Sequence, residues 1–254
     1  MQQPISSSCH VCLRKEGTTH QQGETMPRDI VKVARQGVRI GDRVVTVKKK
    51  GIVYLLIDLS DSMNILVGTK EELALLRGTP RRSADGFTGM CVGKSEHMLR
   101  LKTKLDVALA GMQRFVDRAL ATKMVGIILF GSTAALHHPA SHDQAALRKA
   151  ISAVEQHPLR GGGTNLADAL QILTTMEGTE AAVVVTDGMP NNPARALELG
   201  QVLKNKGTDI LVIGTEDADW LFLSRLRSRP DLSVRTSDEK LAEAITDACR
   251  LLNP

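Results

Sequence analysis

The stretch Ile52–Ser62 reads IVYLLIDLSDS, so six apolar residues in a row are followed at once by acidic and hydroxyl side chains. An unbroken apolar run of this length is typical of a strand that is buried on both faces of a parallel sheet. In open sheets of this kind, ligands bind beyond the carboxyl ends of the strands. The stretch therefore predicts a central strand with a polar site directly after it.

Three similar runs follow along the chain: Val125–Phe130, Ala182–Val185 and Ile210–Ile213. Patterns with apolar residues three or four apart separate them. These patterns predict helices over about 101–120, 166–176, 193–206 and 238–252. Regular alternation of strands and helices favours an open α/β sheet with helices on both faces.

Oxygen-bearing side chains cluster at three points of this pattern. The first run ends in Asp58, Ser60 and Ser62, the run Gly161–Gly163 leads into Thr164, and the third apolar run is followed by Asp187. Because the carboxyl ends of parallel strands meet at one edge, we expect these five side chains to gather there. Hydroxyl and carboxylate oxygens suit Mg²⁺, whereas zinc and copper prefer thiolate or imidazole ligands.

These residues resemble the metal-ion-dependent adhesion site (MIDAS) of von Willebrand factor A (vWA) domains, in the intracellular bacterial type. The resemblance rests on Asp58-x-Ser60-x-Ser62, Thr164 after the glycines and Thr186-Asp187-Gly188, and extends to Lys104-Leu105-Asp106 and Leu129-Phe130-Gly131. It covers the chain from about Gly51 onward. It implies a doubly wound, Rossmann-like fold whose mostly parallel six-stranded sheet has one antiparallel edge strand and helices on both faces.

The resemblance also implies a mechanism. Ser60, Ser62 and Thr164 would touch Mg²⁺, with Mn²⁺ as an alternative, while Asp58 and Asp187 would act mainly through water. A Glu or Asp side chain of a partner protein would complete the metal's ligands. The chain is thus expected to be a non-enzymatic protein-binding module with no catalytic residues.

Related intracellular bacterial proteins work with AAA-type ATPases, as the magnesium chelatase D subunit does, or belong to stress or metal-resistance complexes. The segment Ile52–Asp58 resembles these more than it resembles extracellular adhesins. An AAA-type ATPase is therefore one expected partner, while the oligomeric state is left open.

Two other functions are compatible with parts of the pattern. Phosphatases of the haloacid-dehalogenase type use an Asp after the first strand as nucleophile, with Mg²⁺, but they need a general acid two residues later. Ser60 occupies that position and cannot serve as the acid. The second alternative is a structural vWA scaffold that holds no metal.

The segments before residue 51 differ in composition from the rest. Residues 1–27 are rich in Ser, Gln, Thr and His and are expected to be a flexible tail, in which Cys9 and Cys12 form a C-x-x-C that either binds metal or has no special role. Residues 28–50 hold eight basic residues against two acidic ones. Alternating apolar residues with glycines predict short strands or a hairpin there, whose basic face contacts nucleic acid or an acidic partner, or is simply solvated.

We assign residues 51–254 to the vWA domain. It contains an insertion at 63–99, which leaves the first strand near the predicted metal site and is expected either to shape partner choice or shield the ion, or to be simply disordered. The six aromatic residues disfavour stacking on nucleic acid.

No apolar run approaches the ~20 residues of a membrane span, and Met1–Ser8 lacks the apolar core of a secretory signal, so we expect a cytoplasmic protein.

Overall fold

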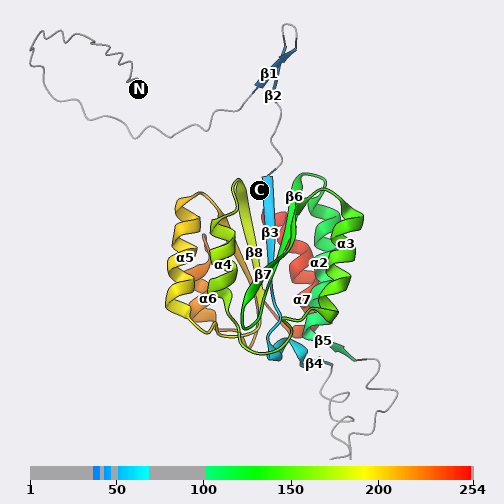
Figure 1. The fold of residues 1–254 in the computed structure, drawn as a ribbon, viewed down its shortest axis with the longest axis vertical. Coiled ribbons are helices and arrows are strands. Elements are labelled where there is room, and N and C mark those ends of the chain that lie inside the picture. The colour runs from blue at the N-terminus through cyan, green and yellow to red at the C-terminus, as the bar shows by residue number, and fades with distance from the viewer. Residues whose placement is uncertain (1–36, 41–42, 47–50, 69–100, 253–254) are drawn as a thin grey trace, which may run out of the picture. The chain divides into compact units, whose positions relative to one another are not determined.

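The structure is a computed structural model that describes residues 37–40, 43–46, 51–68 and 101–252 (Figure 1). The chain divides into two units, Met1–Lys48 and Lys49–Pro254. In the first unit, β1 (Gly37–Ile40) pairs antiparallel with β2 (Arg43–Thr46), which are the short strands that the sequence predicts. Cys9, Cys12 and most of the insertion, residues 69–100, lie outside the described residues.

In the described part of the second unit, six strands form one sheet in the order β10-β9-β8-β3-β6-β7. Neighbouring strands are parallel except for β7, which pairs antiparallel with β6 at the edge. The strands are β3 (Gly51–Asp58), β6 (Lys123–Phe130), β7 (Ala134–Ser141), β8 (Thr179–Thr186), β9 (Asp209–Thr215) and β10 (Ser233–Thr236). The predicted fold class is confirmed, including its antiparallel edge strand.

Helices cover both faces of the sheet (Figure 1). One face packs against α2 (Lys104–Ala119), α3 (Gln144–Ala153) and α7 (Leu241–Leu251), and the other against α4 (Leu166–Thr174), α5 (Pro193–Asn205) and α6 (Trp220–Leu226). Short 3₁₀ turns are η1 (Asp61–Asn64), η3 (Val154–Gln156) and η4 (Asp238–Lys240).

Alternate residues of each central strand enter opposite cores. In β3, Leu55 and Ile57 pack on the side of α2, while Tyr54 and Leu56 pack on the side of α4. Each core therefore buries a strand face, which explains why these strands appear in the sequence as continuous apolar runs. Gly126 of β6 lies beside Tyr54, and a Cβ at this glycine would come within 2.2 Å of the Tyr54 ring. The glycine makes room for the ring.

The first long helix begins three residues later than its apolar pattern suggests. The pattern starts at Leu101, but α2 starts at Lys104. Thr103 caps it: the Thr103 Oγ1 accepts a hydrogen bond from the Asp106 N–H at 3.1 Å, and the Asp106 carboxylate accepts one from the Thr103 N–H at 2.7 Å. This reciprocal cap fixes the start of the helix and leaves Lys102–Thr103 to form β5.

The base of the insertion is a small antiparallel ladder. β4 (Leu66–Val67) follows η1 and pairs with β5 (Lys102–Thr103). The two ends of the segment 69–100 are therefore held next to each other at the amino end of α2. In addition, the Lys104 N–H donates a hydrogen bond to the Ile65 carbonyl at 2.9 Å, which ties this ladder to η1.

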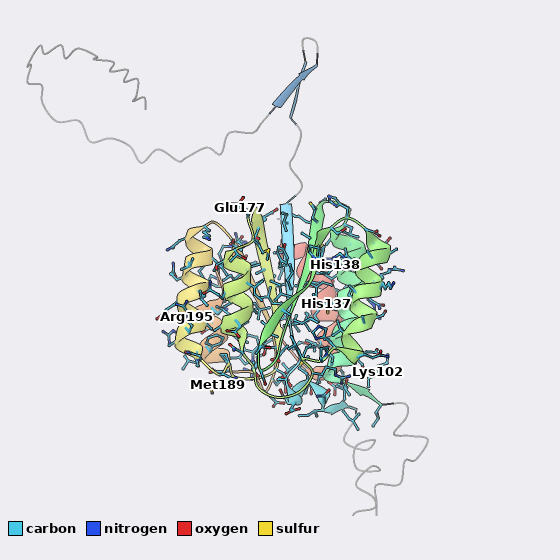
Figure 2. All side chains as sticks on the ribbon, in the orientation of Figure 1. Lys102, His137, His138, Glu177, Met189 and Arg195 are labelled. Atoms are coloured by element: carbon cyan, nitrogen blue, oxygen red, sulfur yellow. The ribbon has the colours of Figure 1, made fainter. Side chains whose placement is uncertain are left out.

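The loops after β3 and β8 lie at one end of the domain. Figure 2 shows Glu177, which precedes β8, at the end opposite to Met189, which follows it. Lys102 lies at the same end as Met189 in that view. Among the described residues, no helix combines the length and the apolar character needed to cross a membrane.

Candidate metal centre

Asp58, the last residue of β3, has no exposed surface. One carboxylate oxygen accepts a hydrogen bond from the Ser60 N–H at 2.8 Å, and the other accepts one from the Thr186 hydroxyl at 2.5 Å. Burial raises the pKa of Asp58 from 3.8 to about 6, although the hydrogen bonds from Thr186 and Ser60 oppose the change, and nearby Asp187 adds to it. The carboxylate is thus oriented by the turn that follows its own strand and by the end of the neighbouring strand β8.

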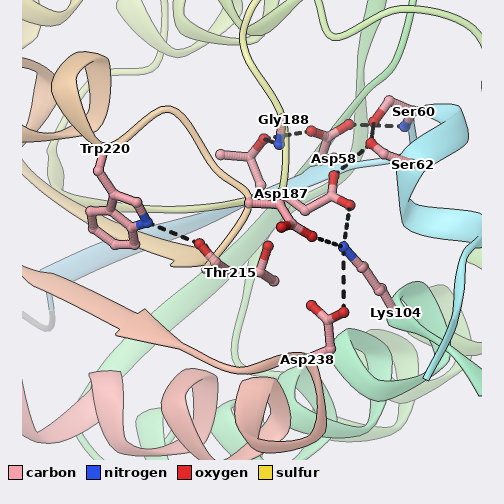
Figure 3. A network of polar contacts seen from close by, with 11 residues as sticks. Asp58, Ser60, Ser62, Lys104, Asp187, Gly188, Thr215, Trp220 and Asp238 are labelled. Atoms are coloured by element: carbon pink, nitrogen blue, oxygen red, sulfur yellow. Dashed lines mark hydrogen bonds and ion pairs between the residues drawn. The ribbon is translucent and has the colours of Figure 1, made fainter. Parts of the chain in front are cut away.

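Ser60 precedes η1 as its N-cap residue, and Ser62 lies within it. Their hydroxyl oxygens are 3.0 Å apart, and the Ser62 hydroxyl donates a hydrogen bond to Asp187 Oδ1 at 2.6 Å (Figure 3). The turn itself is closed by the Met63 N–H, which donates to the Ser60 carbonyl at 3.0 Å. The loops after β3 and β8, 125 residues apart in the chain, therefore meet side chain to side chain.

Thr164 is brought to the same place by the glycine run before it. Gly161 and Gly162 have φ of 89° and 80°, which favour glycine, and the Gly161 N–H donates to the Leu59 carbonyl at 2.8 Å. On the other side, Asn191 accepts from the Thr164 N–H at 3.1 Å. The glycine loop is thus held between the loops that follow β3 and β8.

Gly188 shows that these hydroxyls converge. A Cβ built on Gly188 would lie 3.4 Å from Thr164 Oγ1 and 3.8 Å from Ser62 Oγ. Both hydroxyls therefore lie close to Gly188 and to each other's loop. All five side chains that the sequence places at the site are therefore brought together: Asp58, Ser60, Ser62, Thr164 and Asp187.

Lys104 is part of this arrangement, which the sequence analysis did not anticipate. Its ammonium lies 3.2 Å from Asp187 Oδ2, 3.3 Å from Asp217 Oδ2 and 3.4 Å from Asp238 Oδ2 (Figure 3). Burial works against the charged form, but the negative charge of Asp187 and the other two carboxylates outweighs it, so the pKa of Lys104 is raised. A lysine at the first position of a helix is disfavoured by the helix dipole, and the three carboxylates around Lys104 offset this effect.

The donor set fits a hard divalent cation. Three hydroxyls and two carboxylates converge, and Asp187 Oδ2 is buried without a hydrogen-bond partner, with only the Lys104 ammonium beside it. Such oxygens are the ligands of Mg²⁺ and Mn²⁺ rather than of thiophilic metals. Within the described ranges, no group of three or more His, Cys, Asp or Glu residues could hold a metal alone, so a cation here would depend on the hydroxyls.

Comparison with known proteins agrees with this architecture. Residues 88–189 match the family model of the von Willebrand factor type A domain. This match includes Lys104, Thr164 and Asp187. No curated protein matches the sequence significantly.

Several solved structures share the fold at low sequence identity. Proximal thread matrix protein 1 from the mussel byssus, with a zinc-occupied MIDAS motif, has a TM-score of 0.54 and 18% identity, covering 79% of this chain and 45% of that protein. BatB from Bacteroides thetaiotaomicron has a TM-score of 0.54 and 17% identity, covering 80% and 98%. Manganese-loaded TRAP protein from Plasmodium vivax has a TM-score of 0.50 and 16% identity, covering 78% and 73%. This chain thus spans less than half of the mussel protein.

Proposed function

We propose that this chain, whose second unit has the vWA fold, is a non-enzymatic protein-binding module that holds Mg²⁺ or Mn²⁺ and captures an acidic side chain of a partner protein. The observation that carries the proposal is that hydroxyls from separate loops converge beside Gly188, next to the buried carboxylates of Asp58 and Asp187. The residues that would hold the cation are Asp58, Ser60, Ser62, Thr164 and Asp187.

The charges of the site support capture of an anion. Asp58 and Asp187 contribute two negative charges, and Lys104 offsets one of them. A bound dication would neutralise the two charges of Asp58 and Asp187, because the three hydroxyl ligands are neutral, while Lys104 is also paired with Asp217 and Asp238. The cation would supply a strong electrostatic attraction for a carboxylate in a place where the surrounding protein screens little.

The neighbours of the same fold support a metal-dependent function. One is manganese-loaded and another carries zinc in its MIDAS motif. The preference for Mg²⁺ or Mn²⁺ here is based on the oxygen ligands, since no thiolate or imidazole takes part in the contacts described above.

The site is poorly suited to a haloacid-dehalogenase-type phosphatase. Asp58 has no exposed surface, and both of its oxygens already accept hydrogen bonds. A nucleophilic carboxylate must reach the phosphorus of its substrate, which this one cannot do without breaking both contacts. We therefore assign no catalytic role to it.

The class of partner follows from the resemblance of Ile52–Asp58 to intracellular bacterial proteins. We include in the proposal a cytoplasmic setting, with an AAA-type ATPase or a stress or metal-resistance complex as partner. The strands β4 and β5 pair with each other next to η1, so the chain enters and leaves the insertion close to the candidate site. This position supports a role of the insertion in partner choice.

Titration with Mn²⁺ and Mg²⁺ in a calorimeter tests the metal site. The wild type is expected to bind one ion, and Ser62→Ala to bind it at least ~10-fold more weakly, because a ligand and the Asp187 contact are both lost. Ser224→Ala, an exposed serine of α6, is the matched control and should bind as the wild type does. Absence of binding in the wild type, or equal affinity in Ser62→Ala, would overturn the proposal.

Capture of a partner is tested by pull-down from a cell lysate of the source organism. Partner proteins retained with Mg²⁺ should be released by EDTA and bind again when Mg²⁺ is restored, while the circular dichroism of the domain stays unchanged. Partners that remain bound in EDTA would show that recognition does not use the cation.

A further inference from the structure

Lys104 joins the metal site to the start of the last helix. Its side chain is only 2% exposed, and its ammonium contacts Asp187 of the site and Asp238, the first residue of η4, which leads directly into α7. Asp238 lies 51 residues beyond Asp187 in the chain; among the described residues it has no hydrogen bond or ion pair with the five candidate ligands, although its charge acts on Asp187 through space. The ammonium is the group that the two carboxylates share.

The three acidic neighbours of Lys104 differ in burial. The side chain of Asp187 is fully buried, that of Asp238 is 28% exposed, and that of Asp217 is 78% exposed. Asp217 accepts a hydrogen bond from the ammonium at 3.3 Å, but water screens the charge of so exposed a carboxylate more strongly than that of a buried one. Asp187 and Asp238 are the two more buried carboxylates around the ammonium.

The backbone of Lys104 is held in place by a hydrogen bond and by helix packing. The Lys104 N–H donates to the Ile65 carbonyl, which anchors the start of α2 beside η1. Further along, α2 and α7 touch closely at Gly111, where a Cβ would come within 2.9 Å of the Ala242 backbone. These contacts fix the backbone of Lys104 relative to η1 and α7, so the flexible side chain reaches both carboxylates and its ammonium can pair more closely with either one.

The Lys104 ammonium partly neutralises the negative charge that Asp187 presents to a cation. Its Oδ1 accepts from Ser62, while its buried Oδ2 has the ammonium as its neighbour and no hydrogen bond. An ammonium that pairs more fully with Asp187 weakens the attraction of that carboxylate for a dication. An ammonium that is drawn toward Asp238 strengthens it.

We infer that Asp238 is a positioning residue that tunes the affinity of the metal site from outside it, by sharing the Lys104 ammonium with Asp187. This inference rests on the proposed metal-binding function. It makes the first residue of η4, rather than any ligand, a determinant of how tightly the cation is held.

Calorimetric titration of the full chain with Mn²⁺ at pH 7.5 tests the inference. Asp238→Asn should weaken Mn²⁺ binding about three- to tenfold, because the ammonium then pairs with Asp187 alone. Asp217→Asn removes the same charge from the same cluster at an exposed position and should change the affinity less than about twofold. Equal affinities of Asp238→Asn and the wild type would overturn the inference.

A double-mutant cycle separates the shared ammonium from simple charge attraction. Lys104→Met should tighten Mn²⁺ binding, and adding Asp238→Asn to it should then have no further effect. If Asp238→Asn weakens binding equally in both backgrounds, its charge acts directly on the metal and the role of Lys104 is refuted. Should Lys104→Met fail to fold, Lys104→Arg keeps the charge and must preserve the effect of Asp238→Asn.

Unfolding by urea in EDTA gives a readout that does not involve the metal. Lys104→Met should destabilise the protein, because it leaves the buried Asp187 carboxylate without its cation, and the loss should largely disappear in the Asp187→Asn background. A loss of the same size in both backgrounds would contradict the pairing. A wild type that binds no Mn²⁺ overturns the proposed function together with this inference, whereas normal wild-type binding with an unchanged Asp238→Asn overturns the inference alone.

Discussion

The substitution Asp58→Asn is expected to stabilise the metal-free protein and to abolish metal binding. Asp58 is buried and its pKa is raised from 3.8 to about 6, chiefly by that burial. A carboxyl whose pKa is raised by folding stabilises the fold fully below its unfolded pKa, and this contribution is lost as the pH rises through the folded pKa. The wild type therefore loses stability between about pH 4 and pH 7, and the asparagine variant lacks this loss.

The magnitude follows from the size of the shift. About two pKa units at ~1.4 kcal/mol each correspond to about 3 kcal/mol. The amide can keep both hydrogen bonds, because its oxygen can accept from the Ser60 N–H and the Thr186 hydroxyl can rotate to accept from its NH₂. At pH 8 in EDTA, Asp58→Asn should thus be more stable than the wild type by up to ~3 kcal/mol, and at pH 4 the two should be nearly equal.

Urea unfolding in EDTA measures this, with circular dichroism and the fluorescence of Trp220, the single tryptophan, as two probes that should coincide. Asp61→Asn, an exposed aspartate in the same loop, is the matched control and should leave stability unchanged at both pH values. Excess Mn²⁺ should stabilise the wild type by about 2.7 kcal/mol at 100 times its Kd and leave Asp58→Asn unaffected. A stability difference that does not depend on pH, or an Asp58→Asn protein less stable than the wild type at pH 8, would refute the reasoning.

Three further substitutions test the site and the fold. Thr164→Val should weaken Mn²⁺ binding at least ~10-fold in calorimetry, because the converging hydroxyl is lost. Its free energy of unfolding in EDTA should stay within ~0.5 kcal/mol of the wild type. Unchanged affinity for Mn²⁺ would contradict the role assigned to Thr164. Gly126→Ala should lower the free energy of unfolding in urea by about 1–3 kcal/mol, because its Cβ would collide with the Tyr54 ring. In a Tyr54→Leu background the same substitution should be much less destabilising. An equal loss of stability in that background would show that the collision is not the cause. Thr103→Ala should cost about 1 kcal/mol through loss of the cap on α2, and a thermal midpoint equal to the wild type would argue against that cap.

The central strands and the five candidate ligands could be predicted because their signals are local. Continuous apolar runs such as Val125–Phe130 are visible whenever a strand is buried on both faces. Two other elements give no such local signal: β7 is partly exposed along its length, and α3 buries only Leu147 and Ile151. The antiparallel edge strand was expected only from the resemblance, and α3 was missed. The N-cap of α3, Asp143, was a signal that could have revealed that helix.

The sequence by itself determined the order of strands and helices and the kind of chemistry at the strand ends, because side-chain periodicity and residue type are properties of short segments. Only the tertiary structure decided that Lys104 would lie between Asp187 and Asp238. These residues come from a helix and from the segments that follow β8 and β10, and no local pattern specifies the distance between them. Sheet order and the packing of α2 against α7 set that distance, and with it the charge that the site can offer to a cation.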